Sequence, residues 1–188
     1  VRVIPLDASI KPLTKGNQWI YSVSNFDTLG NSEKQDDEVH NIISSREIDN
    51  ETWFTEQIGS GPATIDQTNR EDGLWYISGS EKIRLTKYPL DGSGDIINEY
   101  THPQSGTLQV VRNATETNVL INTDAGKFRC IKYVDRLQKT NGGIIREPVN
   151  ISWFSPNIGL VRVEIFKEKS SGSQYLAQIR ELKSYLVR

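Results

Sequence analysis

The sequence predicts an all-β protein, built as a single curved antiparallel sheet or half-open barrel with at most one or two short helices. Two observations carry this prediction. Apolar and polar residues alternate with a period of two in short runs, as they do in strands that bury one face. Turn-forming Gly, Pro, Asn and Asp recur roughly every dozen residues, which is typical of all-β domains. Val, Ile, Thr and aromatic residues dominate the runs, which argues against helices.

Length and composition indicate one domain with a thin core. The chain has 188 residues, of which 36% are hydrophobic and 24% are charged. Sheets of this size need not be divided into smaller domains. We therefore interpret residues 1–188 as a single domain, with residues 1–10 as a candidate extended N-terminal segment.

The N-terminal half contains the less regular strands. The first is expected at residues 19–23, with Trp19, Tyr21 and Val23 on one face. The acidic run at residues 31–38 is predicted to be a polar loop. Other expected elements are a hairpin with arms at 39–48 and 52–55 and a turn at 49–51, breaks at 59–62 and 88–95, and strands at 74–77 and 83–86.

The C-terminal half alternates more clearly. Strands are expected at residues 107–111, 118–123, 127–134, 161–165 and 175–180, with turns at 124–126 and 170–173. The best hairpin signal is Asn141-Gly142-Gly143, because these residues tolerate positive φ. The segment after Asp135 is a candidate for one short helical turn.

The charge balance argues against nucleic acid as a partner. The net charge is −2, so the chain as a whole has no attraction to polyanions. Residues 1–100 carry −8 and residues 101–188 carry +6, which we interpret as pairing between strands of the two halves. No stretch approaches the roughly 18 apolar residues of a transmembrane segment.

Residues with chemical potential are few. Cys130 alternates with Phe128 and is expected in the core, rather than as a nucleophile. We interpret His40 and His102 as loop residues, and the turn at 91–95 departs from a calcium loop at its sixth and twelfth positions. We therefore predict no metal, no cofactor and no catalytic residue, so that the protein is not an enzyme.

The aromatic residues provide the one functional hypothesis with a physical motive. Large aromatic side chains sit in expected strands, where they either fill the core or line an apolar groove on an open sheet. The core is the default interpretation. The candidate ligand-binding residues are Trp19, Tyr21, Trp53, Trp75 and Trp153.

Three segments resemble a family of exported bacterial proteins of unknown function, many of which are described as lipoproteins. Residues 153–162 (WFSPNIGLVR) are similar to a "(A/S)PGVGLV(K/R)" signature, although Asn157-Ile158 replaces its Gly-Val. Residues 12–21 (PLTKGNQWIY) are similar to "PLKVGNxWxY". Residues 126–133 (GKFRCIKY) are similar to "GxFxCIxY", and the order of the three segments agrees.

The resemblance implies an envelope or periplasmic protein made with a signal peptide. It implies a half-barrel with Gly16 and Gly159 as turn glycines, Trp19 and Trp153 as core aromatics, and no catalytic residue. The sequence starts at Val1 and contains no methionine. We interpret this as removal of a leader or as trimming of the chain.

Three functions follow as hypotheses. The first is a non-enzymatic envelope or secreted domain that binds a lipid or apolar peptide in its concave face. The alternative is a structural or protein-interaction module that pairs through its edge strands. The third is a hydrolase, whose pair of carboxylates would be hidden among the 24 acidic residues.

Overall fold

The computed structural model describes residues 9–88, 90, 94–102 and 106–188. Within these ranges the chain forms strands and turns and contains no helix. The strands are β1 (Gln18–Phe26), β2 (Ser32–Lys34), β3 (Glu38–Ile48), β4 (Glu51–Ile58), β5 (Thr64–Arg70), β6 (Gly73–Ser78), β7 (Glu81–Lys87), β8 (Asp95–His102), β9 (Gly106–Thr123), β10 (Gly126–Lys139), β11 (Ile144–Ser155), β12 (Gly159–Glu168) and β13 (Gln174–Leu186).

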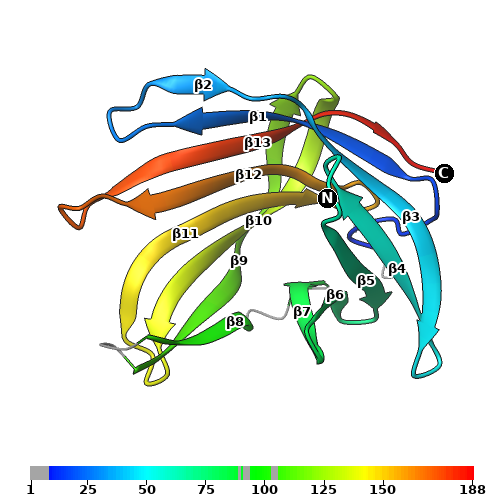
Figure 1. Ribbon diagram of the computed structural model, residues 1–188, viewed down its shortest axis with the longest axis horizontal. Coiled ribbons are helices and arrows are strands. Elements are labelled where there is room, and N and C mark those ends of the chain that lie inside the picture. The colour runs from blue at the N-terminus through cyan, green and yellow to red at the C-terminus, as the bar shows by residue number, and fades with distance from the viewer. Residues whose placement is uncertain (1–8, 89, 91–93, 103–105) are drawn as a thin grey trace.

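All strands belong to one antiparallel sheet. Its order is β7-β6-β5-β4-β3-β1-β13-β12-β11-β10-β9-β8, and β2 pairs only with β1. The sheet curls until its two edge strands, β7 and β8, come to lie close together (Figure 1). This nearly closed barrel confirms the predicted fold class.

Several predicted elements differ from the observed ones. The acidic run contains the short strand β2, and the two expected strands at 107–111 and 118–123 form one continuous strand, β9. The expected helical turn after Asp135 is wrong, because β10 continues to Lys139. Two strands, β5 and β8, were not anticipated. Buried Gln67 and Thr68 in β5 satisfy their polar groups by hydrogen bonds, so this strand lacks the apolar alternation that marks a buried face.

The alternation along β10 changes phase at a bulge. Phe128 and Cys130 are buried, and after the register shift Ile131 and Tyr133 are buried instead of Lys132. A bulge adds one residue to a strand and so exchanges the faces beyond it. The predicted core position of Cys130 is confirmed, since its side chain is 1% exposed.

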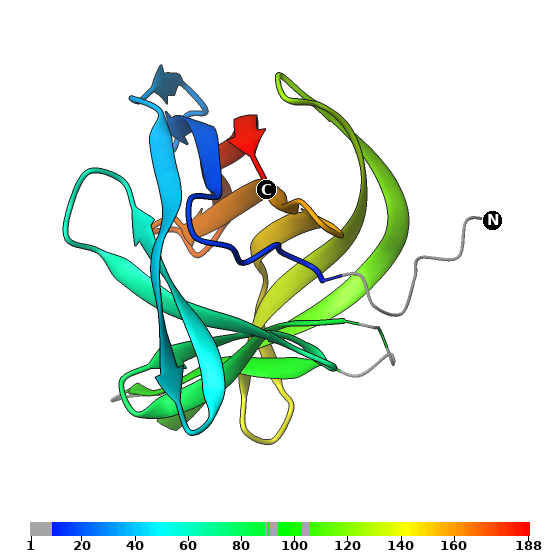
Figure 2. The same cartoon turned by 90° about the vertical axis from the view of Figure 1, so that its right-hand side faces the viewer.

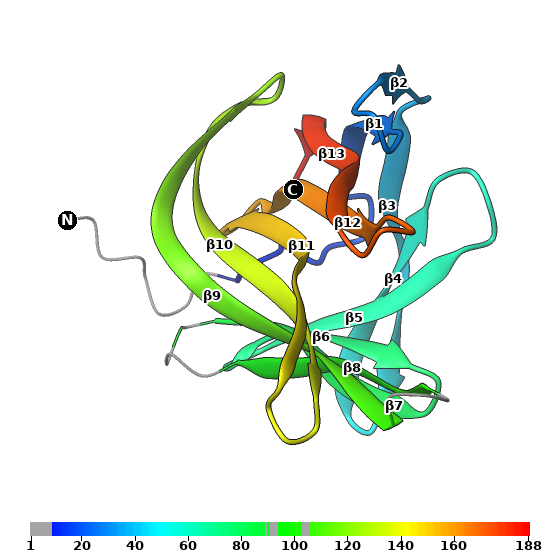
Figure 3. The same cartoon turned by 90° about the vertical axis from the view of Figure 1, so that its left-hand side faces the viewer.

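The hairpin formed by β9 and β10 extends beyond the end of β11 and arches over one end of the barrel (Figure 3). Its inner face packs against the last strand, where the rings of Phe128 and Tyr185 meet edge to face at 5.9 Å.

Residues 9–17 form a strap that runs across the barrel before β1 (Figure 2). Ile10 and Leu13 of the strap belong to the hydrophobic core. The strap passes close to Gly159, where an added Cβ would lie 3.0 Å from Lys11 Cγ and where φ is +101°. Gly159 is therefore required both for the turn and for the close approach of the strap.

The predicted N-terminal segment at residues 1–10 lies mostly outside the described residues. Its last two residues, Ser9 and Ile10, join the strap, and the carbonyl of Ser9 accepts a hydrogen bond from the backbone of Asn157 at 2.7 Å. Within the described ranges there is no helical segment with the length and apolar character that a membrane span requires.

Candidate functional site

The contact between β7 and β8 is the place where the barrel closes, and we call it the seam. Among the described residues, no backbone hydrogen bond joins these two edge strands. Side chains take the place of the missing ladder. The seam is therefore the one junction of neighbouring strands in the described barrel that is held by side-chain chemistry.

On its inner side, the seam is held by long side chains that donate hydrogen bonds to edge-strand carbonyls. These bonds are Tyr76 Oη to the Ile97 carbonyl at 2.9 Å, Arg112 Nη1 to the Leu85 carbonyl at 3.0 Å, and Tyr133 Oη to the Lys87 carbonyl at 2.8 Å. Arg112 reaches from β9 and Tyr133 from β10, so both connect the β8 side of the seam to β7. Capped carbonyls also make an edge strand a poorer template for another chain.

Arg112 is held in place by a buried ion pair. Its Nε and Nη2 atoms donate to the two carboxylate oxygens of Asp135 at 2.6 and 2.7 Å, and Asn150 donates to the same carboxylate at 3.2 Å. Burial alone would lower the pKa of Arg112, but the charge of Asp135 outweighs it and the net shift is upward. The guanidinium therefore stays charged inside the barrel.

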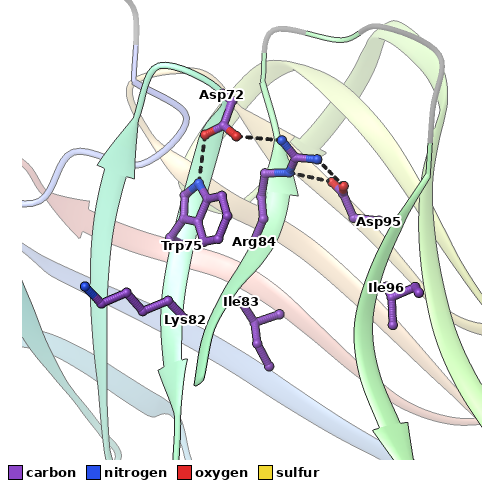
Figure 4. A pocket seen from close by; sticks show the side chains of 7 residues that line it. All are labelled: Asp72, Trp75, Lys82, Ile83, Arg84, Asp95 and Ile96. Atoms are coloured by element: carbon purple, nitrogen blue, oxygen red, sulfur yellow. Dashed lines mark hydrogen bonds and ion pairs between the residues drawn. The ribbon is translucent and has the colours of Figure 1, made fainter. Parts of the chain in front are cut away.

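On the outer side, Arg84 of β7 joins two carboxylates (Figure 4). Its Nε donates to Asp95 of β8 at 3.0 Å, with a second contact through Nη2, and its Nη1 donates to Asp72 at 2.6 Å. Trp75 donates from its indole nitrogen to the other oxygen of Asp72 at 2.8 Å. Thus one guanidinium fastens β8 to β7 and to the turn before β6.

A pocket of about 320 Å³ opens beside this cluster (Figure 4). Three of its side chains are mainly apolar and four are charged: Trp75, Ile83 and Ile96, then Asp72, Lys82, Arg84 and Asp95. The two positive and two negative charges cancel. Ile96 is 50% exposed, although it is a large aliphatic residue.

The carboxylate of Asp72 is kept ionised. Burial tends to raise its pKa, but hydrogen bonds from Trp75 and Arg84 outweigh it and lower the pKa below the ordinary 3.8. A general acid needs the opposite shift, because it must hold a proton near neutral pH.

Of the five predicted ligand-binding residues, Trp75 lines the pocket. The other four are buried in the packed sheet: Trp19, Tyr21, Trp53 and Trp153. Trp19 donates to the Ile158 carbonyl at 2.6 Å and Tyr21 donates to the Leu160 carbonyl at 3.1 Å. These contacts suit core aromatics with satisfied polar ends, and a ligand role for these four residues stays a prediction.

His40 is a second polar site, and here the loop interpretation is wrong. His40 lies in β3, is 8% exposed, and is placed between two carboxylates. Its Nδ1 is 3.0 Å from Glu56 and its Nε2 is 2.7 Å from Glu38. Burial would lower the pKa of His40, but the hydrogen bonds to the two carboxylates outweigh it and raise the pKa. The position of His40 in a predicted hairpin arm was the available signal. His102 ends β8, and its side chain lies outside the described residues.

Glu56 connects His40 to the strap. Lys11 Nζ lies 2.7 Å from both carboxylate oxygens of Glu56, and the ammonium also stands 4.7 Å from the ring centre of Trp19. Burial raises the pKa of Glu56, but the charge of Lys11 and the hydrogen bond from His40 outweigh it and bring the pKa to about 2. Sequence reasoning missed this cluster, because its members come from the strap and two separate strands.

Nucleophilic and metal chemistry find little support in the described residues. Burial raises the pKa of the Cys130 thiol to about 12, so the thiol is protonated at neutral pH. Within the described ranges, no three His, Cys, Asp or Glu residues are grouped so that they could hold a metal ion. The predicted turn at residues 91–95 lies largely outside these ranges.

The chain is a curled all-β domain, and side chains close its barrel at the seam. The chain belongs to the DUF3108-like family, which residues 82–176 match. That segment contains β8 to β12 and almost all of β7, and therefore both edges of the seam. A comparison with curated proteins gives no match.

Two solved structures share the fold over almost their whole length. One is described as a "putative exported protein with YmcC-like fold" from Bacteroides fragilis NCTC 9343, with 15% identity, a TM-score of 0.57, and coverage of 95% of this chain and 99% of that chain. The other is a "putative lipoprotein" from Parabacteroides distasonis ATCC 8503, with 16% identity, a TM-score of 0.56 and the same coverage. At these identities the likeness shows a common fold.

Proposed function

We propose that this chain is a non-enzymatic domain of the bacterial cell envelope that binds a small amphipathic molecule at the seam. The observation that carries the proposal is the pocket beside Arg84, which combines an apolar wall with paired charges. Ligand sites are typically concave and contain fixed polar groups that orient the ligand, and in this pocket the charged side chains outnumber the apolar ones.

The size and charge of the pocket define the ligand class. A volume of about 320 Å³ lies at the lower end of the range for small-molecule sites, which suits one ring system or a short chain rather than a two-chain lipid. The paired charges of Asp72, Arg84 and Asp95 favour an uncharged or zwitterionic polar group. Trp75, Ile83 and Ile96 supply the apolar surface.

The seam is a better supported site than the concave interior. The interior contains Trp19, Tyr21 and the strap, with Ile10 at 1% exposure. A ligand at the seam needs no displacement of these groups.

The proposed location in the cell envelope is supported by the descriptions of the two similar solved structures and by the resemblance of three sequence segments to exported proteins. The solved structures that share the fold are described as an exported protein and a lipoprotein. The three sequence segments that resemble exported proteins lie in the strap and β1, in β10, and across the β11–β12 turn.

The non-enzymatic role is supported by the state of the pocket's carboxylates. Asp72 and Asp95 face one pocket from different elements, as an acid–base pair would. However, both accept hydrogen bonds from Arg84, and the pKa of Asp72 is lowered. This arrangement suits a structural clamp better than proton transfer.

The alternative function, a module that pairs with another protein chain through its edge strands, has weaker support than ligand binding. It required edge strands that are free to pair with another chain. Carbonyls of both edges already accept hydrogen bonds from Tyr76, Arg112 and Tyr133.

The test is extraction of bound molecules from the natively purified protein, followed by mass spectrometry. Ile96→Lys places a charge in the pocket at a half-exposed position, and Leu120→Lys, at 55% exposure on β9, is the matched control. We expect an amphiphile with the wild type and with Leu120→Lys, and at least about tenfold less with Ile96→Lys. Equal amounts in Ile96→Lys, or no bound species in any of the three proteins, would overturn the proposal.

A further inference from the structure

The turn between β10 and β11 projects from the end of the barrel opposite the arching β9–β10 hairpin (Figure 3). We call residues 139–146 the basic tip. It contains two neighbouring large aliphatic residues that face solvent, Ile144 at 56% and Ile145 at 46% exposure. Exposed aliphatic pairs at the end of a hairpin need a reason, because they contribute nothing to the core.

The basic tip has a fixed shape. Lys139 N donates to the Gly143 carbonyl at 2.9 Å, and Gly142 N donates to the Lys139 carbonyl at 2.9 Å. Asn141 accepts from Gly143 N through its side chain at 3.2 Å, and Gly142 has a φ of +86°. The two isoleucines are thus presented by an ordered turn, so that little conformational entropy is lost on binding.

The cations around the tip lack ion-pair partners among the residues that the structure describes. Arg136 and Arg146 each have an Nε atom that is buried without a hydrogen-bond partner, and neither forms an ion pair with a described residue. Exposed Lys139 is also unpaired within the described part of the chain. Of the two acids of this hairpin, Asp135 is paired with Arg112 and Glu147 is exposed, and Glu99 on nearby β8 accepts from Gln109.

Six other arginines of the sheet are used differently, whereas Arg129 of β10 is exposed and has no ion pair with a described residue. A carboxylate lies within ion-pair distance of Arg46, Arg70, Arg84, Arg112, Arg162 and Arg180. The hairpin that carries exposed isoleucines is therefore also a region of uncompensated positive charge. The partly exposed side chain of Arg146 therefore carries a positive charge near the tip that an external anion can approach.

We propose that the basic tip docks the protein onto an anionic lipid surface. Ile144 and Ile145 enter the boundary between headgroups and acyl chains, while Lys139 and Arg146 lie at the level of the lipid phosphates. This arrangement matches interfacial anchors, which combine apolar side chains with Lys and Arg. A protein partner fits less well, because a stable interface buries about 800 Å² on each side and this tip is a narrow projection.

The proposal is independent of the seam. The tip and the pocket share no residue, and docking can be measured with vesicles in the absence of any pocket ligand. Failure of one proposal leaves the other standing.

The experiment is vesicle flotation with phosphatidylcholine alone and with added phosphatidylglycerol. We expect the wild type to bind the anionic vesicles and to be released by salt. The double variant Ile144→Ser/Ile145→Ser loses about half of the hydrophobic free energy that two fully buried isoleucines would contribute. We therefore expect it to bind the vesicles about tenfold more weakly. Lys139→Gln/Arg146→Gln should weaken it by about tenfold or more, only on the anionic vesicles.

The matched control is Leu29→Ser/Leu120→Ser, which removes two other exposed aliphatic residues at 86% and 55% exposure. It should bind as the wild type does. Equal loss in this control, no binding by the wild type, or equal binding to both kinds of vesicle would overturn the proposal. So would a dimer that sediments without vesicles and is abolished by the tip variants. Ile144→Ser alone replaces the double variant if that variant unfolds.

Discussion

Neighbouring strands are held together in different ways in two regions of this barrel. Around β1, β13, β12 and β11, neighbouring strands pair continuously, and the backbone provides the hydrogen bonds. At the seam, β7 and β8 meet through side chains, chiefly Arg84, Arg112 and two tyrosines. The paired region depends little on any one side chain, whereas the seam depends on a few.

This difference shows where the barrel can open locally. A ladder of backbone bonds opens only when many bonds break, but a seam held by a few side chains can open locally. The pocket lies at the seam, and the paired region contains the buried Trp19, Tyr21 and Trp153. The closure of the barrel should therefore rest on a few single residues.

The largest effect is expected for Arg112→Met. This change leaves Asp135, at 0% exposure, without its ionic partner inside the barrel. Loss of one member of a buried pair typically costs about 3–5 kcal/mol. Urea denaturation should show a decrease of this size in the free energy of unfolding.

The rescue variant separates charge burial from loss of packing. Arg112→Met/Asp135→Leu removes both charges and should recover most of the loss. The control is Lys132→Ala in the backbone ladder between β9 and β10, whose partner Glu116 is 54% exposed and which should cost less than about 1 kcal/mol. Equal effects of Arg112→Met and Lys132→Ala would contradict the dependence of the barrel on this buried pair.

The pH dependence of stability should report the cluster that fastens the strap to β3 and β4. The pKa of Glu56 falls from the ordinary 4.5 to about 2 on folding, so its contribution is present above pH 4.5 and is lost as the pH falls toward 2. The pKa of His40 is raised above 6.5, so its contribution is present below pH 6.5 and is lost as the pH rises through the folded value. The free energy of unfolding should therefore be highest between pH 4.5 and 6.5.

Two variants test whether Glu56 causes the loss of stability at acid pH and whether His40 causes the loss at alkaline pH. Glu56→Gln should reduce the acid-side loss by on the order of 3 kcal/mol, and His40→Gln should flatten the alkaline limb. Denaturant titrations across the pH range measure both. An alkaline limb that is unchanged in His40→Gln would exclude His40 as its source.

A smaller effect is expected for Arg84→Ala. Arg84 is 21% exposed, and its partners Asp72 and Asp95 keep some access to water. We therefore expect a loss of about 1–2 kcal/mol in the free energy of unfolding. The reference is Arg162→Ala, which removes a similar two-carboxylate cluster in the paired region. A larger loss of stability for Arg162→Ala than for Arg84→Ala would contradict the idea that the seam depends more on single side chains than the paired region does.

The sequence predicts the fold class well, because alternation and turn residues are local signals. The hairpin at Asn141-Gly142-Gly143 and the strand around Val161 are visible in this way. The strand β5 is not, because its inner positions include Gln67, which meets Lys11 rather than apolar side chains. Alternation identifies faces that are buried by apolar packing, and it misses faces that are buried by hydrogen bonds.

The candidate site is less predictable than the fold. Trp75 was selected among five aromatics, and its partners Asp72 and Arg84 lie beside it in the β6–β7 hairpin. Asp95 belongs to β8, which has no backbone ladder with β7, so alternation and turn residues do not show that its carboxylate meets Arg84. The strap cluster of Lys11, Glu56 and His40 was missed because Lys11 reaches Glu56 from outside the strands that carry the other two residues.

The most direct test of the seam is hydrogen exchange followed by mass spectrometry in the wild type and in Arg84→Ala. Amides of residues 81–87 and 95–99 should exchange faster in the variant, whereas those of residues 160–166 and 176–182 should be unchanged. Faster exchange confined to the first two segments would show that a side-chain clamp holds the barrel closed. Unchanged exchange at those segments, or the same acceleration in all four, would contradict it.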